Sequence, residues 1–246
     1  MLNKMKAALC ASAVAMTCAA QAETIDVAVL YTTPAANASG NISTKINQYI
    51  SHSNRIYRNN GLNITLRNVA TGSVGSADLT PTESTLNSLT NSASIQNFRA
   101  SNRADMVVLL GTSEQLSNGF ICGVGWVGQG SNGTMTSQSR NLMYSITAVD
   151  CAATTFVHEL GHNMGLGHSV RQGSTGGVYT DGVGHGVNNS FSTIMAYPQA
   201  FGSASRLDYF SDPSFNGCNG QPCGVFGQSN SWKTLNAVRD DVSGFY

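Results

Sequence analysis

One eleven-residue stretch, residues 158–168, limits what this chain can be. It has the pattern HExxHxxGxxH, which places His158 and His162 four residues apart. On a helix this spacing puts both imidazoles on one face, where they can bind the same metal ion. Gly165 permits the left-handed backbone conformation that ends helices, so the chain can turn back and bring His168 to the same point. The pattern therefore predicts a helix with two ligands of a zinc ion and a turn that supplies the third.

Glu159 directly follows the first of these histidines. Its carboxylate would stand near the metal without binding it, where a general base can take a proton from a water molecule. Three neutral imidazoles leave the fourth coordination position of zinc open, as in catalytic zinc sites. We therefore predict one catalytic Zn²⁺ bound by His158, His162 and His168, with Glu159 as the catalytic base. Without a metal, three of the chain's five histidines would stand at ligand spacing by chance.

Met195 lies downstream in the sequence Thr-Ile-Met-Ala-Tyr-Pro of residues 193–198. Together with the histidine pattern, this segment resembles the metzincin clan of zinc metalloendopeptidases, in which a methionine turn lies beneath the metal. The resemblance implies that Met195 packs below the histidines. It also implies a catalytic role for Tyr197, which at this spacing can hydrogen-bond the oxyanion of the transition state. The alternative is that Tyr197 only packs in the turn.

The resemblance extends over most of the chain. The segments 26–31, 122–123, 193–198 and 206–211, with the histidine pattern, are similar to bacterial reprolysin-like and peptidyl-Asp metalloendopeptidases. In metzincins the strand that corresponds to residues 120–128 is the sheet edge above the metal, and a substrate pairs with it antiparallel. Glycines at 123, 125 and 128 would let another backbone come close. The alternative is an ordinary glycine-rich loop.

Residues 1–22 have the features of a secretory signal peptide: two lysines, an alanine-rich apolar run and an Ala-Gln-Ala cleavage site. The apolar run is too short for a stable membrane span, and no later segment approaches the roughly 20 apolar residues that a span needs. We predict a protein that is secreted to the periplasm or the extracellular space after cleavage near Ala22. Residues 23–246 have the length of one catalytic domain.

Charge and cysteine content agree with that location. Removing Lys4 and Lys6 leaves 11 basic and 13 acidic residues, so nothing indicates a nucleic acid or an anionic membrane as partner. Four cysteines remain, an even number that predicts two disulfides with three connectivities open. A turn sequence separates Cys218 from Cys223, which favours that local bridge and leaves Cys122 to pair with Cys151. We expect a monomer.

Hydrophobic periodicity predicts the order strand, helix, strand, helix, strand. The strands are expected at 24–31, 62–69 and 105–110, a helix at 41–60, and a second helix that starts at 80–83 and continues through Phe98. This alternation predicts an α/β (α+β) fold with a twisted, mostly parallel sheet backed by helices. By resemblance the fold is metzincin-like, with an antiparallel edge strand and a small irregular C-terminal subdomain. Residues 231–242 are expected to form a final docked helix.

Three further residues lie in loops near the predicted site. A catalytic zinc keeps its fourth position for water, so we predict that His185 is not a ligand. Asp181 could help to bind calcium, but calcium needs roughly six to eight oxygen ligands. Arg206 lies where the resemblance places the pocket for the residue after the scissile bond, and its guanidinium would favour a carboxylate. The alternative for Arg206 is a surface ion pair with Asp208 or Asp212.

The predicted function is a secreted zinc endopeptidase that acts on proteins or peptides, with a preference for cleaving before acidic residues. A zinc amidase that acts on cell-wall peptides is an alternative enzyme. A non-catalytic, zinc-stabilised binding module is the alternative without catalysis. Glu159 argues against the binding module, because such a module does not need a general base.

Overall fold

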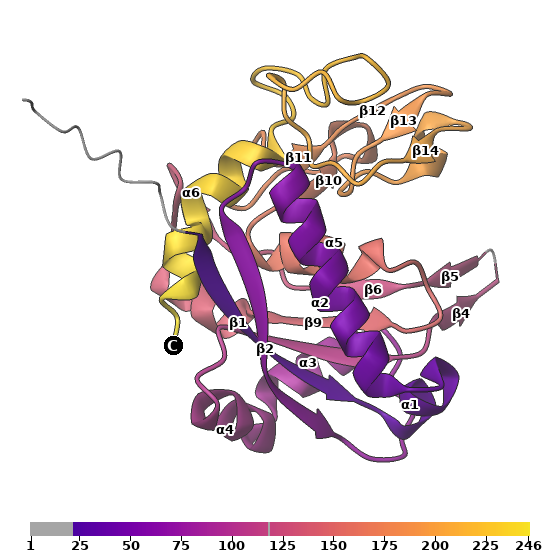
Figure 1. Cartoon of the computed structure of the whole chain (residues 1–246), viewed down its shortest axis with the longest axis vertical. Coiled ribbons are helices and arrows are strands. Elements are labelled where there is room, and N and C mark those ends of the chain that lie inside the picture. Colours follow the sequence, from indigo (N-terminus) through magenta and orange to yellow (C-terminus); the bar gives the residue numbers. More distant parts are fainter. Residues whose placement is uncertain (1–21, 118) are drawn as a thin grey trace, which may run out of the picture.

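The computed structural model describes residues 22–117 and 119–246, so the predicted signal peptide lies outside the described residues except for Ala22 (Figure 1). Its centre is a five-stranded sheet with the strand order β2-β1-β3-β9-β6. The strands are β1 (Glu23–Tyr31), β2 (Ile64–Ser73), β3 (Met106–Gly111), β6 (Gly123–Gly125) and β9 (Tyr144–Ala148). The first four in this spatial order are mutually parallel, whereas β6 pairs antiparallel with β9. The predicted mostly parallel sheet with an antiparallel edge strand is confirmed.

Alternation along β1 divides its side chains between two packed layers. Val27 and Val29 join the core formed with α2 (Ile42–Asn59) and α5 (Thr154–Asn163). Ala28 and Leu30 join a second core, with α3 (Glu83–Asn91) and α4 (Ala93–Ser101). Successive side chains of a strand point to opposite faces, so a wholly apolar strand is stable only when both faces are covered. This arrangement explains the continuous apolar runs.

The structure corrects the predicted second helix. Ser92 has an extended backbone, with φ −73° and ψ 112°, and it separates α3 from α4. Leu89 and Ile95 lie six residues apart, a spacing that does not fall on one face of a continuous helix. The break turns both side chains toward the sheet. The elements that were not predicted include α1 (Thr33–Ser39), which begins with a Thr32 cap and a proline, and the sheet strand β9.

The residues between α5 and the last helix form short, irregular pairings rather than long elements. The last helix, α6 (Ser231–Ser243), starts with an Asn230 cap and packs Leu235, Val238 and Val242 into the core, as predicted. The remaining elements are β4 (Glu114–Leu116), β5 (Gly119–Ile121), β7 (Gly130–Ser131), β8 (Thr134–Met135), η1 (Ser137–Leu142), β10 (Gly167–Ser169), η2 (Val170–Gln172), β11 (Val183–Gly184), β12 (Gly186–Val187), β13 (Phe191–Ser192), η3 (Pro198–Phe201) and β14 (Ser205–Arg206).

The predicted disulfide pairing is confirmed. Cys122 bonds to Cys151 and joins the segment before β6 to the segment before α5. Cys218 bonds to Cys223 across the predicted turn. Within the part of the chain that the structure describes, no helix combines the length and the apolar character that crossing a membrane requires.

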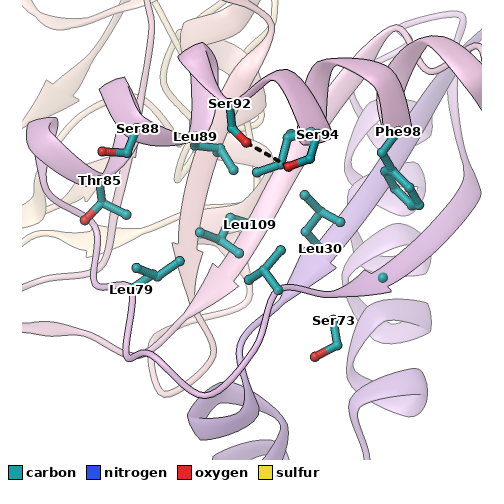
Figure 2. Close-up of a pocket in the computed structure, with 13 residues that line it drawn as sticks. Leu30, Ser73, Leu79, Thr85, Ser88, Leu89, Ser92, Ser94, Phe98 and Leu109 are labelled. Atoms are coloured by element: carbon teal, nitrogen blue, oxygen red, sulfur yellow. Dashed lines mark hydrogen bonds between the residues drawn. The ribbon is translucent and has the colours of Figure 1, made fainter.

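An apolar hollow of about 450 Å³ lies between the sheet and the helices α3 and α4. Figure 2 shows Leu89 and Phe98 of these helices facing Leu30 and Leu109 of the sheet, with serine and threonine hydroxyls around them. The hollow lies in the second core layer, on the face of the sheet opposite α5.

Candidate metal centre and cleft

The helix α5 and the turn after it bring the three predicted histidine ligands together. His158 and His162 lie one turn apart on α5, which ends at Asn163. Gly165 then adopts φ 85°, and β10 carries the chain back past the helix end. Nε2 of His168 lies 3.3 Å from Nε2 of His158 and 3.1 Å from Nε2 of His162. Three imidazole nitrogens therefore converge on one point.

Backbone carbonyls fix the orientation of two of these imidazoles. Nδ1 of His158 lies 2.8 Å from the carbonyl oxygen of Ile194, and Nδ1 of His162 lies 2.8 Å from that of Leu166. A carbonyl oxygen only accepts hydrogen bonds, so each Nδ1 carries the proton and each Nε2 presents a lone pair. This arrangement is the one in which a second-shell partner orients a metal-binding histidine.

Burial keeps the three imidazoles neutral. Desolvation lowers the pKa of His158 well below its usual value, and it lowers the pKa of His168 to about 4. The pKa of His162 is lowered for the same reason. Neutral, convergent nitrogens with fixed lone pairs are the donor set that a transition-metal cation takes, so the three residues fit a metal ion. The three histidines are the metal-binding cluster found among the described residues.

Met195 forms the floor of this centre, as the resemblance implied. It is fully buried, and a Cβ added at Gly161 would come within 2.8 Å of its sulfur. Gly161 lies between the two histidines of α5, so the methionine packs directly against the turn of helix that carries them. A larger side chain at Gly161 would separate the helix from its floor.

Glu159 is buried beside the three imidazoles, with 4% of its surface exposed. One of its carboxylate oxygens has no hydrogen-bond partner among the described residues. Burial raises the pKa of Glu159 to about 8, and the positive charge of Arg206 opposes part of that rise. A cation held by the histidines would favour the carboxylate form further.

The glycines of the edge strand let the helix α5 approach closely, whereas their predicted contact with a substrate backbone stays a prediction. A Cβ added at Gly123 would clash with the Glu159 carboxylate, and one at Gly125 would come within 3.1 Å of the Glu159 carbonyl oxygen. At Gly128 the clash would be with the backbone of Asn163, at the end of α5. The close backbone that these glycines admit is therefore the metal-binding helix itself.

A cleft of about 730 Å³ opens beside the metal centre. The segment from β5 to Gly123 forms one wall, and Tyr197, Gln199 and Arg206 form the other. The ring of Tyr197 lies 4.5 Å from the ring of His168, centroid to centroid. Burial raises the pKa of the Tyr197 phenol, and the neighbouring Glu159 adds to this effect. The structure thus places the predicted tyrosine at the histidines.

Arg206 lies in the cleft and not in a surface ion pair. It belongs to β14, which pairs parallel with β13. Its Nε is buried without a hydrogen-bond partner in residues 22–117 and 119–246. Asp208 instead pairs with Arg55 at 3.5 Å. Burial lowers the pKa of the Arg206 guanidinium, against the opposing effects of Tyr197 and Glu159. The alternative role considered for Arg206 therefore finds no support here.

Two other candidate residues are not part of the metal centre. The ring of His185 packs 5.8 Å from that of Phe191, outside the three-histidine cluster. The carboxylate of Asp181 accepts hydrogen bonds from the Lys233 ammonium at 2.6 and 2.7 Å. Gln172 was not predicted, although its side-chain oxygen accepts a hydrogen bond from the backbone N–H of Tyr197. Gln172 forms a capping box with Ser169 at the start of η2, and the S-x-x-Q pattern of residues 169–172 is the sequence signal that could have identified it.

The site combines three convergent imidazoles, a buried carboxylate beside them and a cleft along the edge of a mostly parallel sheet, which are features that metallopeptidases share. Comparison with known families places it further. The model of the reprolysin-like metallopeptidases, family M12B, matches residues 20–229, and the chain belongs to that family.

Curated relatives agree with this placement. The chain is 36% identical to the peptidyl-Asp metalloendopeptidase of Pseudomonas aeruginosa, over 98% of this chain and 44% of that protein. It is 27% identical to the peptidyl-Asp metalloendopeptidase of Xanthomonas campestris pv. campestris, over 90% of this chain and 52% of that protein. The chain thus spans about half the length of these relatives.

Solved structures support the fold. A chain from a structure titled "Structure of a chaperone-substrate complex" matches with a TM-score of 0.70 and 20% identity, over 92% of this chain and 36% of that one. At this identity the match concerns the fold alone.

Proposed function

We propose that residues 23–246 are the catalytic domain of a zinc endopeptidase. The observation that carries the proposal is the convergence of three neutral imidazoles next to a buried carboxylate with an unpaired oxygen. Three nitrogen ligands and an open fourth position suit a catalytic zinc ion. When bound there, zinc supplies Lewis acidity and lowers the pKa of water, so that hydrolysis can proceed at neutral pH.

The side chains around the histidines carry the proton transfers and orient the substrate. Glu159 takes the proton of the attacking water and passes it to the amine that leaves when the peptide bond breaks. Its buried position keeps bulk water from competing for that proton. Tyr197 donates a hydrogen bond from its phenol to the oxygen on which negative charge develops. The free edge of β6 pairs with the substrate backbone in antiparallel fashion.

Arg206 selects an acidic residue directly after the scissile bond. Its side chain is half-buried with a buried Nε, lies on the cleft wall opposite the β5–β6 segment and has no acidic partner within the described residues. A substrate carboxylate would supply the missing partner through charge-assisted hydrogen bonds. The curated relatives are named peptidyl-Asp metalloendopeptidases, which agrees with an aspartate-directed site.

The domain acts outside the cytoplasm after removal of residues 1–22 as a signal peptide. Two disulfides support this location, since such bonds persist in oxidising compartments. The proposed chemistry needs no group beyond the three histidines, Glu159 and Tyr197 of one chain, so we propose that the domain acts as a monomer. N-terminal sequencing of the exported protein tests the cleavage near Ala22.

Cut-site mapping tests the proposed function. Zinc-loaded protein is incubated with a denatured protein substrate, with and without a zinc chelator, and the products are identified by mass spectrometry. We expect chelator-sensitive cleavage with aspartate or glutamate after the cut. Absence of cleavage, together with activity on cell-wall peptides, would contradict an endopeptidase and favour an amidase.

A further inference from the structure

The hairpin formed by β4 and β5 extends the cleft wall beyond the metal centre. Its strands pair antiparallel, with Leu116 opposite Gly119 and Gln115 opposite Phe120. Figure 1 shows the hairpin projecting from the body of the molecule next to β6. β5 continues through Cys122 into β6, and residues 119–123 of this segment line the same cleft as His158 and Glu159. The edge of the active-site cleft thus continues onto the hairpin.

Large apolar side chains are exposed where the hairpin meets the cleft. Phe120 is 61% exposed and Leu116 is 48% exposed. Among the seven large apolar side chains that are exposed in the described residues, these two and Tyr197 line the cleft. An exposed phenylalanine costs solvation free energy unless a partner covers it. Its position in the cleft indicates that the partner is the substrate.

The hairpin offers almost no charge to a ligand. Glu114 is the one charged residue in the sequence of 114–121, and its carboxylate accepts a hydrogen bond from the Thr80 hydroxyl. The Gln115 amide donates to the carbonyl oxygens of Leu116 and Gly119 within the hairpin itself. Apart from the Ser117 hydroxyl, the side chains of the described hairpin residues that line the cleft are therefore apolar.

Strand direction fixes which part of a substrate reaches the hairpin. A peptide that pairs antiparallel with β6 runs from Gly125 toward Gly123, so its C-terminal part continues along β5. The scissile bond lies beside Gly123, because the Glu159 carboxylate lies against that residue. Phe120 is three residues further on, about 10 Å along an extended strand. That distance corresponds to the second or third residue C-terminal to the scissile bond.

We propose that Phe120, extended by Leu116, is a specificity-determining residue that binds an apolar substrate side chain two or three positions C-terminal to the scissile bond. This inference rests on the proposed function, because it assigns a subsite to the same cleft. The substrate class is then a peptide with an acidic residue directly after the cut and an aromatic or branched aliphatic residue shortly beyond it. Cross-strand packing of two apolar side chains supplies the selectivity.

A peptide library with aspartate fixed after the cut tests the subsite. The library varies the next three positions, and the native, zinc-loaded chain is expected to enrich aromatic and aliphatic residues at the first or second of them, which are the second and third positions after the scissile bond. In Phe120→Ser that enrichment should disappear, and kcat/KM should fall about tenfold for a peptide with leucine there. The same variant should leave peptides with serine at that position unchanged. Phe226→Ser is the matched control, because Phe226 is 74% exposed and does not line the cleft.

The outcomes separate the two proposals. Absence of cleavage by the native chain would contradict the endopeptidase function itself. Cleavage with no apolar enrichment in the native chain would overturn the subsite without use of any variant. An equal loss for all peptides in Phe120→Ser, or an equal effect of Phe226→Ser, would also overturn it. An unchanged cleavage profile with altered self-association in sedimentation would assign the hairpin to contacts between copies of the chain instead.

Discussion

The cleft beside β6 and the hollow under α3 and α4 are of comparable size but differ in what lines them. The hollow of about 450 Å³ is enclosed by aliphatic and aromatic side chains with serine and threonine hydroxyls, and no titratable group lines it (Figure 2). The cleft of about 730 Å³ contains His158, Glu159, Tyr197 and Arg206, whose pKa values are all displaced by burial.

The difference shows which feature identifies the functional site. An apolar hollow needs no partner to be compatible with the fold, whereas a buried charge without a partner destabilises it. Four desolvated groups in one cleft therefore indicate chemistry, even though an apolar cavity also suits small ligands. Four predictions test this contrast.

The largest expected effect is in the cleft. Glu159→Gln removes the general base but keeps the shape of the side chain, so kcat should fall about 10³-fold. The bound metal, measured by elemental analysis of the purified protein, should stay at the native ratio because the three histidines are intact. Glu83→Gln is the matched control, since Glu83 is an exposed glutamate at the start of α3, near the hollow. Retained turnover in Glu159→Gln would mean that another group acts as base.

The hollow should respond in stability and not in activity. Leu89 is 4% exposed and lines the hollow. Leu89→Ala enlarges an apolar space that already exists, and it should lower the free energy of unfolding by about 2–4 kcal/mol. Urea unfolding measures this loss, while kcat/KM at a temperature far below unfolding should stay native. The exposed Val170→Ala should change neither quantity. A fall in kcat/KM of the folded Leu89→Ala protein would show that the hollow is coupled to the cleft.

Arg206 should affect substrate choice more than catalysis. Charge-assisted hydrogen bonds contribute about 1.5–3 kcal/mol, so Arg206→Gln should lower kcat/KM about 10- to 100-fold for peptides with aspartate after the cut. Peptides with alanine at that position should be cleaved at nearly the native rate. Arg55→Gln controls for the loss of one positive charge, because Arg55 pairs with Asp208 on the surface. Equal losses for both peptides would assign Arg206 a structural role.

The sequence predicted the regular parts of the fold because their apolar residues recur at fixed spacing. β1, α2 and β3 follow such patterns, since each buries one or both faces. β9 was not predicted because Ser145 and Thr147 interrupt its apolar run, although all five of its residues are buried. A buried hydroxyl in a central strand looks like a loop residue when only the sequence is known.

The site was predictable where ligand spacing or family resemblance constrained it. His168 followed from the motif, whereas Tyr197 and Arg206 depended on resemblance. Tyr197 caps the four-residue helix η3 and Arg206 lies in the two-residue strand β14, and elements this short have no period to detect. The carbonyls of Ile194 and Leu166, which orient the histidines, leave no trace in the sequence because any residue supplies a carbonyl. The contact of Gly123 with Glu159 was not predicted for a related reason: a glycine indicates a close approach but does not identify what approaches.

The smallest predicted effect is on the pH dependence of stability, and it comes from a buried carboxyl group outside the cleft and the hollow. Asp105, 2% exposed, accepts hydrogen bonds from the backbone N–H groups of Asp26 and Tyr246, and burial raises its pKa to about 6. The folded state therefore binds more protons than the unfolded state between the ordinary aspartate pKa and about 6, so stability should fall as pH rises through this range. Asp105→Asn removes one acceptor at every pH but does not titrate. Its stability deficit, measured by urea unfolding, should therefore shrink between pH 4 and pH 7.

The pH profile of kcat/KM should be the same for Asp105→Asn and the native chain, because Asp105 does not line the cleft. Such a result would show that the displaced pKa of Asp105 comes from burial alone and has no part in catalysis, unlike the displaced pKa values of the cleft residues. A shifted pH profile of kcat/KM would instead mean that the charge of Asp105, just before β3, influences the groups of the metal centre. In that case displaced pKa values would not distinguish the cleft from the rest of the molecule. Side-chain contacts with the substrate would then be needed to identify the catalytic groups.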